Sequence, residues 1–120
     1  MKYTWLEQYL LSKKGVHKDF KAEWNWDRYL IEDKMFAAVC YADDGKAIYI
    51  TLKLDPVEGD YLRTQYEDII PGYYMNKVHW NSVRADGNVP DELLQTLLDK
   101  SYALVLSGFS KKKQAQIPGE

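Results

Sequence analysis

The stretch MNKVHWNSVRADGNVPDELL, residues 75–94, contains three consecutive structural signals that decide the fold around it. The side chains of residues 78–84 alternate in character with the period of two that is typical of a half-buried β-strand. An Asp-Gly pair at residues 86–87 then marks a turn. Pro90 and the two carboxylates that follow it have the pattern of a first helical turn. We therefore predict a strand, a turn and a helix in this order.

The helix that begins at Pro90 is predicted to be long and amphipathic. Its apolar and small side chains recur at spacings of three and four residues, which places them on one face. Gly108 marks the end of this pattern. The stripe consists of Leu94, Leu97, Leu98, Ser101 and Val105. We predict that Leu97 and the strand residue Trp80 are buried in the same core.

The first part of the chain predicts a short helix followed by a strand. Thr4 and Glu7 have the spacing of a capping box, and Gly15 can end the helix that follows. Apolar side chains alternate through residues 20–31, but they change sides near Asp27. We interpret this change as a bulge or bend near Asp27 and Arg28 within a single strand.

Two further strands and a second helix follow. Residues 34–41 and 47–54 have strand patterns, and the Asp-Gly signal at residues 43–45 joins them as a hairpin. Asp55, which stands directly before a proline, is the expected N-cap of a helix that runs to about Glu67. The apolar side chains expected to share one face of this helix are Val57, Tyr61, Leu62 and Tyr66.

Together these elements predict an α+β fold, in which an antiparallel sheet packs on an N-terminal helix, a middle helix and a long C-terminal helix. With 120 residues the chain has the size of one domain, so we expect residues 1–120 to form a single domain. The tail from about residue 110 is polar and contains Pro118 and Gly119, and we expect it to be loose.

The composition is that of a globular protein. Hydrophobic residues make up 46% of the chain and charged residues 28%, which excludes an intrinsically disordered protein. The longest apolar run, residues 35–42, is far shorter than the ~20 residues of a membrane-spanning helix, and the N-terminus lacks a signal-peptide pattern. A single cysteine, Cys40, excludes an internal disulfide bond and fits a reducing compartment. We expect a cytoplasmic protein with no membrane partner.

The charges are distributed unevenly. The formal net charge is -2, which argues against a strongly basic nucleic-acid-binding protein. Residues 1–21 nevertheless carry five lysines against two carboxylates, and residues 108–120 carry three lysines against one. The remaining middle holds eight basic and fifteen acidic residues. If the two basic ends meet in space they form one positive surface, and if they do not, each is an ordinary solvated region.

Five segments of the chain resemble, in this order, the YjbR/MmcQ family of small bacterial proteins. They are LLSKKGVHKDF, WNWDRYLIEDKMFAAV, ITLKLDP, PGYYMNKVHWNSVRADGNVPDELL and LLDKSYALV. The resemblance extends over about residues 4–113. It implies an α+β fold similar to the double-wing domain of a phage transcription factor, and also comparable with the frataxin-like CyaY fold. Family members are often labelled DNA-binding because of this similarity, which is an analogy of fold and does not fix a function.

Two groups of residues are candidates for binding nucleic acid. In the central stretch, Lys77 can hold a phosphate, and Trp80, Tyr73 or Tyr74 can stack a base beside the polar Asn76, His79 and Asn81. The second group is a basic edge, which we define as the lysines near the two ends of the chain and expect to converge beside the end of the last helix. It consists of Lys13, Lys14, Lys18, Lys21, Lys111, Lys112 and Lys113.

Both groups also have a purely structural interpretation. Trp80 and Val78 can fill the core, Asn76 can shape a turn, and Lys77 can cap backbone carbonyls. The lysines of the basic edge can be a helix exit and a solubilising tail. These alternatives remain open from the sequence.

The sequence contains no pattern that favours catalysis or a bound cofactor. Neither His17 nor His79 has an adjacent partner that would orient it, and Cys40 lies in an apolar strand, where cysteine is usually a small buried hydrophobe. No zinc-ligand spacing is present. Frataxins resemble one another in an acidic ridge on the first helix, whereas the first helix predicted here holds Glu7 as its one acidic residue. We therefore expect no enzymatic activity, no cofactor and no metal site.

The function expected from the sequence is a nucleic-acid-binding or regulatory module of the YjbR/MmcQ type. DNA would be bound weakly and in a salt-dependent manner. The alternative is a protein-interaction module whose partner is another protein. The sequence leaves the ligand, any sequence preference and the oligomeric state open.

Overall fold

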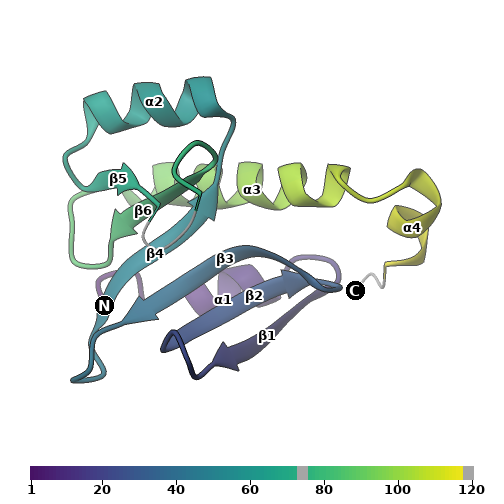
Figure 1. The fold of residues 1–120 in the computed structure, drawn as a ribbon, viewed down its shortest axis with the longest axis horizontal. Coiled ribbons are helices and arrows are strands. Elements are labelled where there is room, and N and C mark those ends of the chain that lie inside the picture. The colour runs from purple at the N-terminus through teal and green to yellow at the C-terminus, as the bar shows by residue number, and fades with distance from the viewer. Residues whose placement is uncertain (73–75, 118–120) are drawn as a thin grey trace.

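A computed structural model describes residues 1–72 and 76–117, and within these residues the strands form one antiparallel sheet in the order β1-β2-β3-β4-β6-β5 (Figure 1). The strands are β1 (Val16–Lys21), β2 (Trp26–Ile31), β3 (Lys34–Tyr41), β4 (Ala47–Lys53), β5 (Ile69–Pro71) and β6 (Trp80–Arg84). The helices are α1 (Leu6–Leu11), α2 (Pro56–Gln65), α3 (Asp91–Ser107) and α4 (Lys111–Gln116). The predicted α+β fold with an antiparallel sheet and a long C-terminal helix is confirmed.

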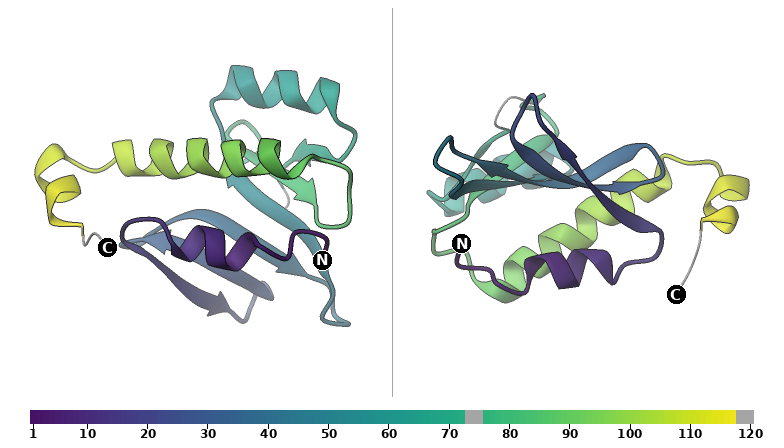
Figure 2. Two further views of the ribbon diagram at one scale, coloured as in Figure 1. Left: turned by 180° about the vertical axis from the view of Figure 1, so that it is seen from behind. Right: turned by 90° about the horizontal axis from the view of Figure 1, so that it is seen from below.

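One face of the sheet, which we call the helix face, is covered by α1 and α3 (Figure 2). Val39, Ile50 and Val83 lie opposite one another on three neighbouring strands and are buried in the main core beneath these helices. The side chains next to them in sequence point to the other side, because successive residues of a strand face opposite ways. We call this other side the pocket face, and it carries Arg28, Ala38, Thr51 and Ser82 in register.

The long strand predicted for residues 20–31 is instead a hairpin of β1 and β2. The chain reverses at residues 22–25, where Asn25 adopts a φ of 59°, a conformation that Asn tolerates better than most residues. The Asn25 amide then donates to the carbonyl of Ala42 at 3.1 Å, which ties the turn to the end of β3. The change of side near Asp27 lies within β2 itself, where Trp26 belongs to a small second cluster and Tyr29 to the main core. A separate register shift does occur in β2, between Tyr29 and Leu30.

The capping box predicted at Thr4 and Glu7 does not form. The helix α1 begins at Leu6 after Trp5, which makes no side-chain capping hydrogen bond. The Glu7 carboxylate is engaged elsewhere: it contacts the Lys18 ammonium and accepts a hydrogen bond from the Tyr29 hydroxyl at 3.3 Å. A tertiary ion pair has thus replaced the local cap.

The start of α2 agrees with the sequence prediction, but its packing face does not. Asp55 accepts hydrogen bonds from the backbone N–H groups of Val57 at 3.1 Å and Glu58 at 3.4 Å. Leu62 is buried, whereas Val57 is 78% exposed and Tyr61 is 62% exposed. The prediction of one shared apolar face is therefore wrong, because α2 packs over the short β5 end of the sheet and covers little of it.

The long helix α3 has the predicted stripe of buried residues from Leu94 to Val105. Leu97 is 1% exposed and belongs to the main core. The prediction that Trp80 and Leu97 are buried in the same core is wrong, because Trp80 is half-buried and lies opposite Lys53 on the pocket face. The two residues are thus separated by the sheet.

Both ends of the described chain are anchored. The Tyr3 hydroxyl is buried and donates to the carbonyl of Val89 at 2.7 Å. At the other end, the prediction of a loose tail is wrong for residues 110–117: Ser110 caps α4 by accepting from the N–H of Lys113 at 3.1 Å, and Ile117 is buried in the main core. An apolar contact after the polar segment holds the tail in place.

Candidate nucleic-acid interface

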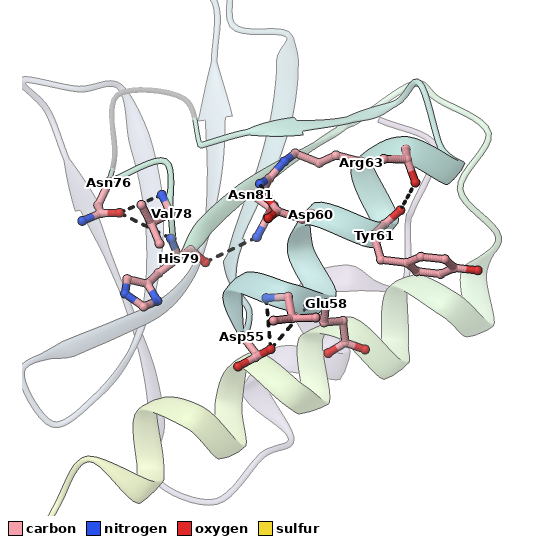
Figure 3. A network of polar contacts seen from close by, with 11 residues as sticks. Asp55, Glu58, Asp60, Tyr61, Arg63, Asn76, Val78, His79 and Asn81 are labelled. Carbon is pink, nitrogen blue, oxygen red and sulfur yellow. Dashed lines mark hydrogen bonds and ion pairs between the residues drawn. The ribbon is translucent and has the colours of Figure 1, made fainter.

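The polar residues of the central stretch mainly build structure (Figure 3). The Asn76 side chain accepts from the N–H of Val78 at 2.8 Å and so forms a turn ahead of β6. Asn81 is fully buried, accepts a hydrogen bond from Arg63 of α2, and donates to the carbonyl of His79 at 3.3 Å. These contacts fit the structural interpretation of the asparagines.

Lys77 and Trp80 have different roles at this turn. The Lys77 ammonium donates to the carbonyl of Gly72 at 3.2 Å, as expected for a lysine that caps backbone groups. Val78 is exposed and fills no core, while Trp80 faces a pocket on the pocket face. The candidates Tyr73 and Tyr74 lie outside the described residues.

The N-terminal lysines of the basic edge do not form one surface. Lys13 contacts Asp99 of α3, and its ammonium lies 4.8 Å from the ring centroid of Tyr9. Lys18 and Lys21 are three residues apart on β1 and therefore face opposite sides of the sheet. The expectation that these lysines lie on a single basic edge is therefore wrong for Lys18 and Lys21, because side chains an odd number of residues apart on a strand point to opposite faces.

Four of the seven lysines of the basic edge, Lys13, Lys18, Lys21 and Lys113, are already paired with carboxylates. Lys18 contacts Glu7 and lies 3.7 Å from Asp27, and Lys21 lies 3.6 Å from Glu23. The contact with Lys18 lowers the pKa of Glu7. A phosphate would have to displace these carboxylates to reach the ammonium groups.

Of the C-terminal lysines, Lys113 lies beside the β2–β3 turn. Lys113 forms an ion pair with Glu32 at 2.9 Å, and the carbonyl of Glu32 lies 2.7 Å from the ring of His17. Within residues 1–72 and 76–117, Lys14, Lys111 and Lys112 have no carboxylate at ion-pair distance. The nucleic-acid role of these exposed lysines stays a prediction.

A pocket of about 360 Å³ opens on the pocket face where β3 and β4 separate. Ala37 and Leu52 are the last residues paired between these strands at this end. Beyond them the Ser101 hydroxyl of α3 bridges the gap: it donates to the carbonyl of Phe36 at 2.6 Å and accepts from the N–H of Lys53 at 2.8 Å. The helix therefore satisfies the separated backbone groups.

The walls of the pocket combine aromatic, aliphatic and charged side chains from distant parts of the chain. Trp24 comes from the β1–β2 turn and Trp80 from the start of β6. The full lining consists of Trp24, Arg28, Asp33, Lys34, Met35, Lys53, Trp80, Leu104, Val105 and Gly108. Of the sequence candidates for nucleic-acid binding, the structure places Trp80 in this lining.

The pocket carries a net positive charge, since three basic residues face one carboxylate, Asp33. Arg28 is held by Asp19 across the β1–β2 pair, with hydrogen bonds of 2.8 and 2.6 Å, and this contact lowers the pKa of the Asp19 carboxyl. Lys34 and Lys53 have no such partner among the described residues. They are therefore the cations available to an anionic ligand.

Sequence reasoning missed most of this pocket. Trp24 was assigned to the interior of a long strand, whereas the structure places it in a turn, where it is 47% exposed. It contacts Trp26 edge to face, with ring centroids 5.1 Å apart, and the Lys21 ammonium lies 5.1 Å from its ring centroid. The signal that could have revealed the turn is WNW at residues 24–26, because Asn favours the left-handed conformation.

Cys40, the single cysteine of the chain, is not available as a nucleophile. Cys40 is fully buried, and burial raises the pKa of its thiol to about 12, so the thiol is protonated at neutral pH. Among the residues that the structure describes, no three His, Cys, Asp or Glu side chains are grouped so that they could hold a metal ion. Across the same part of the chain, each helix is too short or too polar to cross a membrane.

Comparison with solved structures supports this architecture. The chain superposes on protein DR2400 of Deinococcus radiodurans, which carries the domain DUF419, with a TM-score of 0.81 and 32% identity. The match covers 92% of this chain and 83% of that protein. A Pseudomonas syringae protein matches with a TM-score of 0.70 over 87% of this chain and 98% of its own. At 24% identity, this second likeness shows the fold alone.

Relatives are also found by sequence. The Escherichia coli K12 protein YjbR is 31% identical over 109 residues, which is 91% of each chain. YyaQ of Bacillus subtilis is 35% identical over 60 residues, half of each chain. The YjbR family model matches residues 11–104, which include the segments that line the pocket except for Val105 and Gly108 at the end of α3. The chain belongs to the YjbR family.

Proposed function

We propose that this protein is a nucleic-acid-binding module whose interface is the pocket between Trp24, Trp80 and the cations Lys34 and Lys53. The observation that supports it best is the combination of two tryptophans with two lysines that have no carboxylate partner among the described residues. Aromatic rings offer stacking surfaces to bases, and free ammonium groups attract phosphates. The proposal needs no catalytic group.

The charge distribution supports a modest affinity. The whole chain has a net charge of -2, so the field around it does not attract a polyanion over long range. Binding must therefore come from local contacts at a few sites. Few phosphate contacts imply weak binding, and the slope of log affinity against log salt should be small because it is proportional to the number of these contacts.

Fluorescence anisotropy with labelled oligonucleotides at low and physiological salt tests the proposal. The test variant is Lys34→Gln with Lys53→Gln, which removes two charges from the pocket while keeping most of each aliphatic stem. The matched control is Lys14→Gln with Lys112→Gln, which removes the same charge from exposed lysines elsewhere. We expect the pocket variant to reduce the slope of log affinity against log salt by about 1.4 to 1.8, from 0.7 to 0.9 per lost phosphate contact.

The control variant should leave that slope nearly unchanged. If the control variant reduces the slope of log affinity against log salt and the pocket variant does not, the exposed lysines of the basic edge form the interface. If the unmodified protein binds no oligonucleotide even at low salt and high micromolar concentration, the nucleic-acid proposal is wrong.

A protein-interaction module is the second candidate, and the exposed side of α2 favours it. Val57 and Tyr61 are one helical turn apart and both are largely exposed, which is unusual for apolar side chains on one helix face. Tyrosine is also enriched at protein interfaces. Affinity capture from the native cell, with unmodified protein and with Val57→Ser and Tyr61→Ser, tests it. A partner retained equally by both forms would speak against this surface.

A further inference from the structure

The shape of the pocket restricts which form of nucleic acid it can accept. Its volume of about 360 Å³ lies near the lower end of the roughly 300–1,000 Å³ that is typical of ligand pockets. This is room for a small unit such as one nucleotide. A duplex groove is read by an element that protrudes into it, such as a helix or a β-ribbon, and a concave pocket cannot enter a groove.

The aromatic walls lead to the same restriction. Trp24 and Trp80 can stack only on a base whose flat face is free. In a duplex both faces of each base are covered by neighbouring bases, and exposing one costs unstacking and unpairing energy. A single strand presents bases that are already accessible.

The cations are placed to hold a phosphate next to such a base. Lys34 starts β3 and Lys53 ends β4, and both line the pocket together with the two tryptophans. The Lys34 ammonium also lies 5.8 Å from the ring centroid of Phe109, just after α3. An anion bound between the two strand ends would meet two positive charges from two strands.

We infer that the pocket accepts one unpaired nucleotide of a single strand, with its base against the tryptophans and its phosphate against Lys34 and Lys53. This inference rests on the proposed function and narrows it to single-stranded nucleic acid. Stacking and phosphate contacts are shared by DNA and RNA, so both single strands are expected to bind.

The test uses anisotropy at low salt with a labelled oligothymidine, an oligouridine of the same length, and a blunt duplex. At least one single strand should bind about tenfold more tightly than the duplex. Trp24→Ala should weaken single-strand binding by about fivefold or more, the usual effect of losing one stacking ring, while Trp24→Phe should keep most of the affinity. Circular dichroism confirms that both variants are folded, since Trp24 is half-exposed in a turn.

Each contrary result has a distinct meaning. Equal binding of duplex and single strand, or an unchanged affinity in Trp24→Ala, overturns this inference but leaves a nucleic-acid-binding protein. If thymidine 5′-monophosphate competes at the same concentration as the oligonucleotide, the inference of a single-stranded ligand is wrong, and the pocket binds a free nucleotide instead. No binding of any nucleic acid overturns the proposed function together with this inference.

Discussion

The helix face and the pocket face use the same strands but differ in their side chains and in their cover. Val39, Ile50 and Val83 on the helix face are fully buried beneath α1 and α3, so their contribution is the stability gained by removing apolar surface from water. Lys53 and Trp80 on the pocket face are half-buried. The comparison teaches that changes on the first face should mainly affect unfolding, and changes on the second should mainly affect binding.

The largest effect is expected on the helix face, from Leu97→Ala. Leu97 is 1% exposed in the main core, so its truncation should lower the free energy of unfolding by about 2 to 5 kcal/mol. Val57→Ala on the exposed side of α2 is the control and should change it by less than about 0.5 kcal/mol. Urea unfolding followed by tryptophan fluorescence measures both. An unchanged midpoint for Leu97→Ala would contradict the packing described for α3.

A smaller effect is expected where the two faces meet, at Ser101. Its hydroxyl satisfies the carbonyl of Phe36 and the N–H of Lys53, and Ser101→Ala would leave both backbone groups without this partner. We expect a loss of about 1 to 3 kcal/mol in the free energy of unfolding. Ser107→Ala removes a hydroxyl from the exposed end of the same helix and serves as the control. Equal effects of the two variants would show that Ser101 does not hold the strand ends.

On the pocket face itself, Gly72→Ala should disturb both stability and the pocket. A Cβ added to Gly72 would lie 2.8 Å from the Cβ and 2.9 Å from the carbonyl oxygen of Trp80. Part of this clash is with backbone, so β6 must shift, at a cost of about 1 to 3 kcal/mol. Gly108→Ala, whose nearest contact would be 3.2 Å, should be milder. Thermal unfolding measures both, and a wild-type Tm for Gly72→Ala would contradict the close approach.

The smallest effect concerns the Asp19–Arg28 pair. The Arg28 guanidinium lowers the pKa of the Asp19 carboxyl in the folded protein. The pKa of Asp19 is therefore lower in the folded protein than in the unfolded chain. At a pH above the unfolded pKa, the pair makes its full contribution to the stability of the folded protein. This contribution is lost as the pH falls through the folded pKa. Asp19→Asn should therefore lower the Tm slightly at pH 7 and flatten its decline at acid pH. Identical curves of Tm against pH for both proteins would rule out this contribution.

The sequence predicted the helix face better than the pocket face for a physical reason. The stripe on α3 is a local pattern, and it was found as predicted. The pocket depends on which strands become neighbours, which brings Trp24, Lys53 and Trp80 together from three separate segments. No spacing in the sequence encodes that meeting.

The errors also have identifiable causes. The hairpin turn was taken for a bulge because alternation continues on both sides of Asn25, and the side chain periodicity alone does not distinguish a reversal from a kink. The tail was expected to be loose because residues 111–116 are polar, yet Ile117 packs in the core. One apolar residue after a polar run was too weak a signal.

The anchoring of the first residues has a consequence for how the chain acquires its structure during synthesis. Tyr3 bonds to Val89, 86 residues later, and Tyr9 bonds to Asp99, 90 residues later. The N-terminal helix therefore leaves the ribosome long before Asp99 and the rest of α3 have been made. Contacts of such separation slow folding, so α1 is expected to dock late, after most of the chain has been made.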